Sequence, residues 1–359
     1  MLMHVNLLHH NQENDAAGFL QEKYGGYYPM KKFEGYEKGI NFGGWLSQCD
    51  HTKERYDTFI VEKDFEEVKN RGYDHVRVPI DYELFENKDM SFKEGGFAYI
   101  EFAIDMCRKY GLNMVLDLHR TPGYSFDPGH NEAGFFENEK YQNHFYLIWE
   151  TLARRFGNNA DMLTFEILNE VTKKEYSDTW NRISTECIRR IRTIAPDIRI
   201  LLGGYYNNSI EALKDLPAPY DDKIIYNFHC YEPLIFTHQG AYWIPSMDTS
   251  FRCPFKMTYR EYVERGNEQL GDIHVDFSPF DPDSCPGEDY FDYLLKEAVE
   301  VAKERDVALY CGEYGVIDLA DEADRRVWYD TFHKVMDKYN ICRAVWNYKE
   351  MDFEVPKDL

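Results

Sequence analysis

The sequence predicts one α/β domain with the architecture of a (β/α)8 barrel, and three observations lead to this fold class. Eight short, almost continuously apolar runs follow residue 39, as expected of parallel strands that are buried on both faces. Longer amphipathic stretches separate most of these runs, and such alternation is typical of a parallel sheet. Once the single very long connection, 230–288, is set aside, about 250 residues remain, which is the usual size of such a barrel.

The predicted strands, in order, are 39–44, 73–79, 112–119, 163–170, 198–204, 224–229, 307–313 and 342–347. The predicted helices between them are 61–71, 95–110, 139–156, 178–194, 289–305 and 322–339, several of which end at Gly or Asn.

The remaining segments complete the predicted organisation. Residues 1–38 form an N-terminal extension that we expect to cover the barrel base, and 39–359 form a single (β/α)8 domain. The connection 230–288 follows the sixth strand and is rich in Tyr, Phe, Pro and Asp. Because long loops in compact domains are usually functional, we expect a loop insertion over the face where barrels build active sites. A crossing helix with irregular packing is the alternative.

Composition excludes several classes of protein. The chain has 64 acidic and 41 basic side chains, a net charge of −23, which argues against binding to nucleic acid or to an anionic membrane. No apolar run approaches the roughly 18 residues that a membrane-spanning helix needs. The count of 28 Tyr, 24 Phe and 6 Trp exceeds what a core alone needs.

The cysteines and the first residues bear on the cellular compartment. Eight cysteines are scattered singly with no CxxC pair, so we expect reduced thiols. The first residues lack a basic leader and an apolar run of secretory type, so a cytoplasmic protein is expected, or a secreted one if a leader has been removed.

Polar and aromatic side chains gather where the predicted strands end, which is the catalytic rim of a barrel. They are Arg77 after the second strand, His119 after the third, Asn169 and Glu170 after the fourth, His229 and Tyr231 after the sixth, Glu313 after the seventh and Trp346 after the eighth.

Glu170 and Glu313 are the candidate catalytic pair. Each follows a buried apolar strand, where an unpaired carboxylate is costly. Taken alone, each is better explained as a surface charge or a structural ion pair. Together at one barrel mouth, two carboxyls about 5–5.5 Å apart are the geometry of retaining glycoside hydrolysis. Arg77 and Tyr231 are placed to keep the nucleophilic carboxylate ionised, whereas the acid/base needs a raised pKa.

The other rim residues fit a sugar-binding cleft. Asn169 is placed to bind a sugar hydroxyl, and His119 and His229 supply further polar contacts, although a lone core histidine is more often structural. Trp346 is expected to form an indole floor under a sugar ring, the alternative being a core Trp that closes the barrel. Possible further subsites are Trp45, Tyr124, Phe126, Trp243 and Tyr348.

Other chemistries have little support in the sequence. A hydrolytic zinc site would favour HxH or HExxH, and neither occurs, so we expect no metal. There is no GxSxG nucleophile motif and no glycine-rich phosphate loop before a helix.

Several motifs carry a family resemblance. HVRVP with Arg77, DLH with His119, LNE with Glu170, HCY with His229, GEYG with Glu313 and VWNYK with Trp346 resemble glycoside hydrolase family 5, over about residues 38–354. The segments GINFGGWLSQ, YNFHCYEPLIFTHQGAYW and AVWNYKEMDFE look most like the bacterial endoglucanase C group, subfamily 37.

The resemblance implies a retaining endo-β-1,4-glucanase that needs no cofactor, with Glu170 as acid/base and Glu313 as nucleophile. Its partner would be a β-glucan polysaccharide or oligosaccharide, with no nucleic acid or membrane, and we expect a monomer. A β-1,4-mannanase, or a bifunctional glucanase/mannanase, would use the same catalytic set. A non-catalytic carbohydrate-binding barrel is the remote alternative.

The chain departs from the family pattern after the eighth strand. Only thirteen residues follow Trp346, where a family barrel continues into an eighth helix. We expect residues 14–24, which start with possible capping residues, to form a helix that takes its place.

Overall fold

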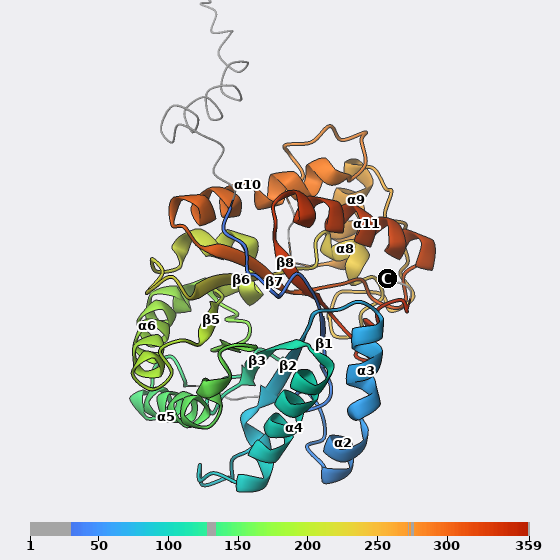
Figure 1. The fold of residues 1–359 in the computed structure, drawn as a ribbon. Helices are drawn as coiled ribbons and strands as arrows, with labels where there is room; N and C mark the ends of the chain where they lie inside the picture. The colour runs from blue at the N-terminus through green and yellow to red at the C-terminus, as the bar shows by residue number, and fades with distance from the viewer. Residues whose placement is uncertain (1–29, 128–133, 272, 274–275, 358–359) are drawn as a thin grey trace, which may run out of the picture.

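A computed structural model describes residues 30–127, 134–271, 273 and 276–357. Eight parallel strands pair in the order of the sequence and close into a barrel, with β1 bonded to both β2 and β8. Long helices lie around the outside of the strands (Figure 1). The predicted (β/α)8 barrel is therefore confirmed.

All eight predicted strands are present, with different ends. They are β1 Lys38–Asn41, β2 His75–Asp81, β3 Asn113–Arg120, β4 Leu163–Glu166, β5 Arg199–Leu202, β6 Ile224–Cys230, β7 Ala308–Tyr314 and β8 Cys342–Val345. Two of these differences matter for the site. Strand β4 ends at Glu166, so Asn169 and Glu170 lie in the loop that follows, whereas β2 continues to Asp81 and holds Arg77 near its middle.

The six predicted helices are also present. They are α3 Glu62–Asn70, α4 Glu94–Tyr110, α5 Glu139–Phe156, α6 Ser177–Ile194, α10 Glu288–Glu304 and α11 Glu322–Lys338. A short helix not predicted from the sequence, α2 Lys53–Thr58, precedes α3. Between β5 and β6 the described chain has only the tight turn α7, Tyr205–Asn208, and a 3-10 helix, Ile210–Asp215.

The long connection after β6 is a loop insertion with two short helices, α8 Leu234–Thr237 and α9 Tyr259–Gln269. Thr258 caps α9 and forms a reciprocal capping box with Glu261, which explains where this helix begins. The rings of Tyr259, Phe277 and Tyr290 pack together, and Tyr290 belongs to α10. The insertion is thus anchored to the barrel by its own aromatic cluster.

The base of the barrel is filled by the end of the N-terminal extension. Phe33 and Tyr36 stack at 4.1 Å and join a buried cluster with strand residues such as Val115 and Tyr310. The Tyr36 hydroxyl donates to the Met162 carbonyl oxygen at 2.8 Å. This short segment therefore closes the barrel at the end opposite the candidate site.

The flank beside β8 is partly covered by the chain that follows that strand. Phe353 and Val355 are buried, Arg71 after α3 donates to the Pro356 carbonyl oxygen, and Arg325 of α11 donates to that of Glu354. Residues 353–357 therefore cross from α11 towards α3. The predicted helix 14–24 lies outside the described residues.

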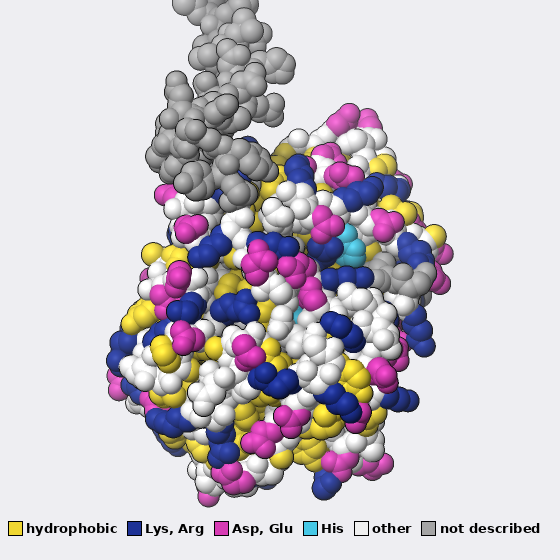
Figure 2. Space-filling model, in the orientation of Figure 1, with side chains coloured by type: hydrophobic (Ala, Val, Ile, Leu, Met, Phe, Trp, Pro, Cys, Tyr) yellow, Lys and Arg dark blue, Asp and Glu magenta, His cyan; other side chains and the backbone are white. Residues whose placement is uncertain are grey.

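Two further expectations concern the surface and the thiols. All eight cysteines are free. Acidic and basic side chains are interspersed over the face shown in Figure 2, without an extended basic patch. Among the described helices, none has the length and apolar character required to cross a bilayer.

Candidate active site

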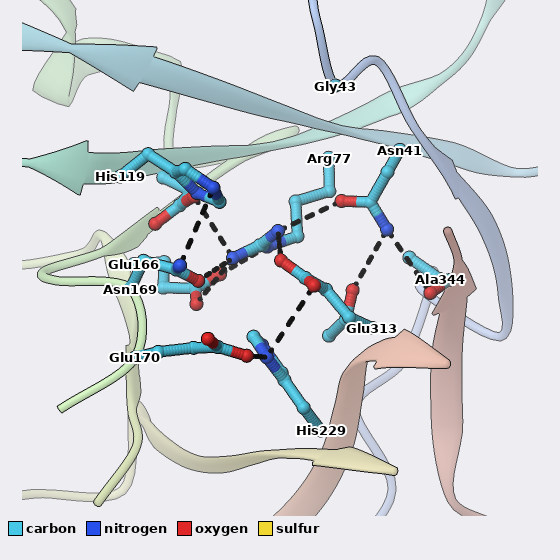
Figure 3. Close-up of polar contacts among 12 residues, drawn as sticks. Asn41, Gly43, Arg77, His119, Glu166, Asn169, Glu170, His229, Glu313 and Ala344 are labelled. Atoms are coloured by element: carbon cyan, nitrogen blue, oxygen red, sulfur yellow. Dashed lines mark hydrogen bonds and ion pairs between the residues drawn. The ribbon is translucent and has the colours of Figure 1, made fainter. Parts of the chain in front are cut away.

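Arg77 lies at the centre of the site and is fully buried inside the barrel (Figure 3). The prediction that it sits at a strand end was wrong, because β2 continues to Asp81 and Arg77 is its third residue. Its guanidinium forms ion pairs with three carboxylates: two bonds of 2.7 and 2.9 Å to Glu166, one of 2.7 Å to Glu313, and a contact of 3.0 Å with Asp117.

Two amides complete the shell around this guanidinium. It donates to the side-chain oxygens of Asn41, at 3.0 Å, and of Asn169, at 2.9 Å. A planar cation with several fixed donors suits such a convergent set of acceptors. Arg77 thereby ties β1, β2, β3, β4 and β7 together beneath the site.

The Glu313 carboxylate on β7 is held from both sides. Arg77 donates to its Oε1, as the sequence predicted, and the Tyr231 hydroxyl donates to its Oε2 at 2.9 Å. Burial, and next to it the negative charge of Glu313, raise the pKa of Tyr231 well above its usual range, so the phenol keeps its proton and donates. A buried carboxylate with a cation and an O–H donor is stabilised in its charged form.

Glu170 lies in the loop after β4 and has the opposite electrostatic environment. Its Oε1 is 2.8 Å from His229 Nδ1, and its Oε2 accepts a hydrogen bond of 2.7 Å from the Asn207 amide. Burial raises the pKa of its carboxyl to about 7, although the bond from Asn207 acts in the other direction. The Tyr124 hydroxyl donates to the Glu170 carbonyl oxygen at 2.8 Å and so fixes the backbone here.

The two glutamates face one another across the mouth. One carboxyl oxygen of each lies within 4.8 Å of the other and of a His229 ring nitrogen. Such a distance between one oxygen of each carboxyl fits the close class of carboxyl pairs, in which the two groups are about 5–5.5 Å apart. Burial lowers the pKa of His229 to about 4, so this histidine is neutral between the two acids at neutral pH.

His119 and Trp346 form an adjoining wall. Their rings lie parallel with centroids 6.0 Å apart, and Phe126 meets the edge of His119 at 4.8 Å. His119 Nδ1 is 2.6 Å from Asp117, and its Nε2 is 3.5 Å from the Asn169 amide nitrogen. Only 6% of Trp346 is exposed, so a small part of the indole is accessible to a ligand.

Two of the five predicted further subsites, Trp45 and Tyr348, are wrong, because both side chains are buried in contacts away from the barrel mouth. Trp45 is fully buried, packs against Phe65 and donates its indole N–H to the Tyr56 carbonyl oxygen. The Tyr348 hydroxyl donates to Asp64 of α3 at 3.0 Å, outside the barrel.

Tyr124 is 6% exposed, like Trp346, and its hydroxyl supports the Glu170 backbone, so its role in a subsite stays a prediction. Phe126 and Trp243 are half-buried and keep a surface that a ligand could contact. Trp243 meets His238 edge to face and packs on Phe353, and His238 in turn contacts Tyr231.

Sequence reasoning missed several residues of the site. Asp117 and Glu166 stand inside the apolar runs VLDLH and LTFEIL, and the cost of burying a charge could have identified both. Asn41, at the end of β1, and Asn207, in the turn after β5, have no comparable signal because a polar amide at a loop boundary is ordinary.

Among the described residues, two groups of side chains bring three possible metal ligands within 4.8 Å of one another: Glu170, His229 and Glu313, and a second group of His51, Asp81 and Glu83. An arginine contacts every member of the second group and pairs with one member of the first. In the second group, Arg120 lies 2.8 Å from Asp81, 3.2 Å from Glu83 and 3.1 Å from His51. In the first, Arg77 pairs with Glu313 at 2.7 Å. These donor sets do not suit a second cation.

Comparisons with known proteins agree with this geometry. The family described as "Cellulase (glycosyl hydrolase family 5)" matches residues 35–352. Cellodextrinase A of Ruminococcus flavefaciens is 45% identical over 314 residues, covering 88% of this chain and 86% of that protein. Endoglucanase C of Acetivibrio thermocellus is 38% identical over 332 residues, covering 89% and 93%.

Among solved structures, endoglucanase Cel5A of Thermotoga maritima shares the fold, with a TM-score of 0.70 and 23% identity over 89% of this chain and 92% of the other. The resemblance to subfamily 37 stays a prediction.

Proposed function

Because this chain belongs to glycoside hydrolase family 5, the cellulase family, we propose that it is a retaining endo-β-1,4-glucanase in which Glu170 is the acid/base and Glu313 the nucleophile. The observation that carries the assignment is the contrast between the two carboxyls. Glu313 accepts hydrogen bonds from a buried arginine and a tyrosine, whereas burial raises the pKa of Glu170 to about 7. The protonated acid and the charged nucleophile are therefore set by their surroundings.

In the first step, the Glu313 carboxylate attacks the anomeric carbon while Glu170 gives its proton to the glycosidic oxygen. The bond from the anomeric carbon to that oxygen breaks, a glycosyl ester to Glu313 forms, and the shortened chain leaves as an alcohol. Arg77 loses part of its ion pair with Glu313 as the ester forms, and its remaining partners hold it in place.

In the second step, Glu170, now ionised, takes a proton from a water molecule that attacks the same carbon. The ester bond to Glu313 breaks, and both glutamates return to their starting protonation states. Two inversions at one carbon give net retention of its configuration. The carboxyl oxygens, within 4.8 Å of each other, are close enough for direct attack by one glutamate.

We propose β-1,4-linked glucans and cellodextrins as substrates. The relatives named cellodextrinase and endoglucanase support this class of substrate, and their names imply glucan substrates of different length. Carboxymethyl-cellulose, barley β-glucan, glucomannan and cellohexaose distinguish the alternatives. A drop in carboxymethyl-cellulose viscosity ahead of reducing-end release supports endo action. Faster cleavage of glucomannan than of β-glucan would favour the bifunctional or mannanase alternative.

The matched variants Glu170→Gln and Glu313→Gln keep side-chain size and remove the carboxyl chemistry. Each is expected to abolish most turnover of barley β-glucan while leaving the fold intact. Near-normal hydrolysis by either purified variant would refute the assignment, and hydrolysis of no β-glycan by the unsubstituted protein would leave only a binding barrel.

A further inference from the structure

The turn after β5 has an unusual backbone. Tyr206, Asn207 and Asn208 all have positive φ, at 49°, 58° and 55°. Left-handed conformations are uncommon for residues other than glycine, and three in succession persist only where the surroundings hold them in place. Strain of this kind is found at functional sites, so the contacts of this turn indicate what it holds.

Asn207 connects the turn to the loop that carries Glu170. Its side-chain amide donates to Glu170 Oε2 at 2.7 Å. Its backbone N–H donates to the carbonyl oxygen of Val171, the residue that follows Glu170, at 2.9 Å. The left-handed backbone brings both groups towards the same loop. One residue therefore fixes both the carboxyl and the chain that bears it.

Asn208 holds the other oxygen of the same carboxyl indirectly. Its side chain is fully buried and lies 3.4 Å from His229 Nε2, while His229 Nδ1 lies 2.8 Å from Glu170 Oε1. A Cβ at position 203 would lie 2.2 Å from the Asn208 side chain. The Asn208 amide therefore fits in its place only because residue 203 is glycine. The turn thus contacts Glu170 by two routes, one to each oxygen.

We propose that this left-handed turn is a positioning device for the acid/base, in which Asn207 holds Glu170 directly and Asn208 holds it through His229, so that the turn sets the upper pH limit of activity. The inference rests on the proposed role of Glu170 as acid/base. Nothing in that role requires an amide at position 207.

The Asn207 amide is a hydrogen-bond donor, and this fixes the direction in which it changes the pKa of Glu170. An N–H that donates to a carboxylate favours its charged form. Burial raises the pKa of Glu170 to about 7, and the Asn207 bond opposes that rise. Without the amide, the pKa of Glu170 rises further under the effect of burial, so the carboxyl keeps its proton to higher pH.

Other titratable or charged groups also face Glu170. They are Arg77 on β2, Asp117 and His119 on β3, Asp127 in the following loop, His229 on β6, Tyr231 after it, and Glu313 on β7.

The test compares two glycine variants of adjacent residues. Asn207→Gly removes the amide and keeps the left-handed backbone, which glycine adopts without strain. Tyr206→Gly makes the same backbone change one residue earlier, at an exposed side chain for which the structure gives no bond to Glu170. The readout is the pH profile of kcat/KM on cellotetraose, whose alkaline limb reports loss of the acid's proton.

We expect Asn207→Gly to move the alkaline limb upward by about 1 to 2 pH units, the size of shift that one hydrogen bond to a charged carboxyl produces. Tyr206→Gly should leave the limb where it is. Asn207→Asp, which replaces a donor with a negative charge, should move it further upward. A limb unchanged in Asn207→Gly, or moved equally in both glycine variants, overturns the proposal.

A second substrate separates this inference from the proposed function. With 2,4-dinitrophenyl β-cellobioside, whose leaving group needs no proton, Asn207→Gly should not shift the alkaline limb. An equal shift on both substrates overturns the positioning role. If Glu170→Gln instead hydrolyses cellotetraose normally, the acid/base assignment itself fails.

Discussion

Replacement of Arg77 by methionine removes the cation around which the site is built. Arg77 is fully buried and lies 2.7 to 3.0 Å from three carboxylates, of Asp117, Glu166 and Glu313, which are themselves at most 7% exposed. Removing one partner of a buried ion pair typically costs about 3–5 kcal/mol, because the remaining charges stay buried without compensation. We expect a loss of about this size in the free energy of unfolding, or a Tm lower by about 4–7 °C.

The loss should depend on pH in a defined direction. Burial already raises the pKa of Asp117, to about 7, and that of Glu166, while the positive charge of Arg77 opposes both rises. Without the guanidinium, these two folded-state pKa values rise further above the unfolded values of about 4. The folded variant then binds more protons than the unfolded chain, and its stability falls as pH rises. The penalty should be larger at pH 7.5 than at pH 5.

Chemical denaturation at both pH values measures these differences. Arg108→Met is the matched control, because Arg108 and Asp161 form an ion pair in which both side chains are about half exposed, and such pairs contribute below about 1 kcal/mol. An Arg77→Met penalty no larger than that of Arg108→Met, or one that grows as the pH falls, would refute the electrostatic account of the site.

Three further outcomes follow from the same geometry. Glu170→Gln should lower kcat/KM on cellotetraose by about 10³-fold but on 2,4-dinitrophenyl β-cellobioside by less than about tenfold, because only the first leaving group needs general acid catalysis; equal losses on both would contradict its role. In the unsubstituted protein, kcat/KM on cellotetraose should fall as the pH rises through about 7, where Glu170 loses its proton, and a profile flat to pH 9 would exclude that assignment. Trp45→Ala should cost about 3–5 kcal/mol of stability and leave the KM for cellotetraose unchanged, as expected of a core ring; a raised KM with normal stability would restore Trp45 as a subsite.

The sequence was sufficient to predict the barrel, because strands buried on both faces must be apolar along their whole length. The same reasoning gave Glu170 and Glu313 as the candidate pair, since a carboxyl at the end of a buried apolar run is unusual. It also placed Arg77 and Tyr231 on the nucleophile, and both contacts are present.

The remaining features depend on geometry that periodicity does not encode. The number of aromatic residues does not show which of them line a cleft and which belong to the core. Trp45 and Tyr348 are therefore predicted as subsites, although Trp45 is fully buried and Tyr348 points towards α3. Arg77 lies further from the rim than expected because β2 runs on to Asp81. Asn207 reaches Glu170 only through a left-handed backbone, which no local pattern predicts.

We propose that Glu313 forms a covalent bond with the sugar while Glu170 transfers the proton, and one measurement tests both roles. A 2-deoxy-2-fluoro β-cellobioside with a good leaving group slows the second step, so the intermediate accumulates and its site can be found by peptide mass spectrometry. We expect one sugar per chain, attached to Glu313. Attachment to Glu170, or hydrolysis with no adduct and with inversion at the anomeric carbon, would contradict it.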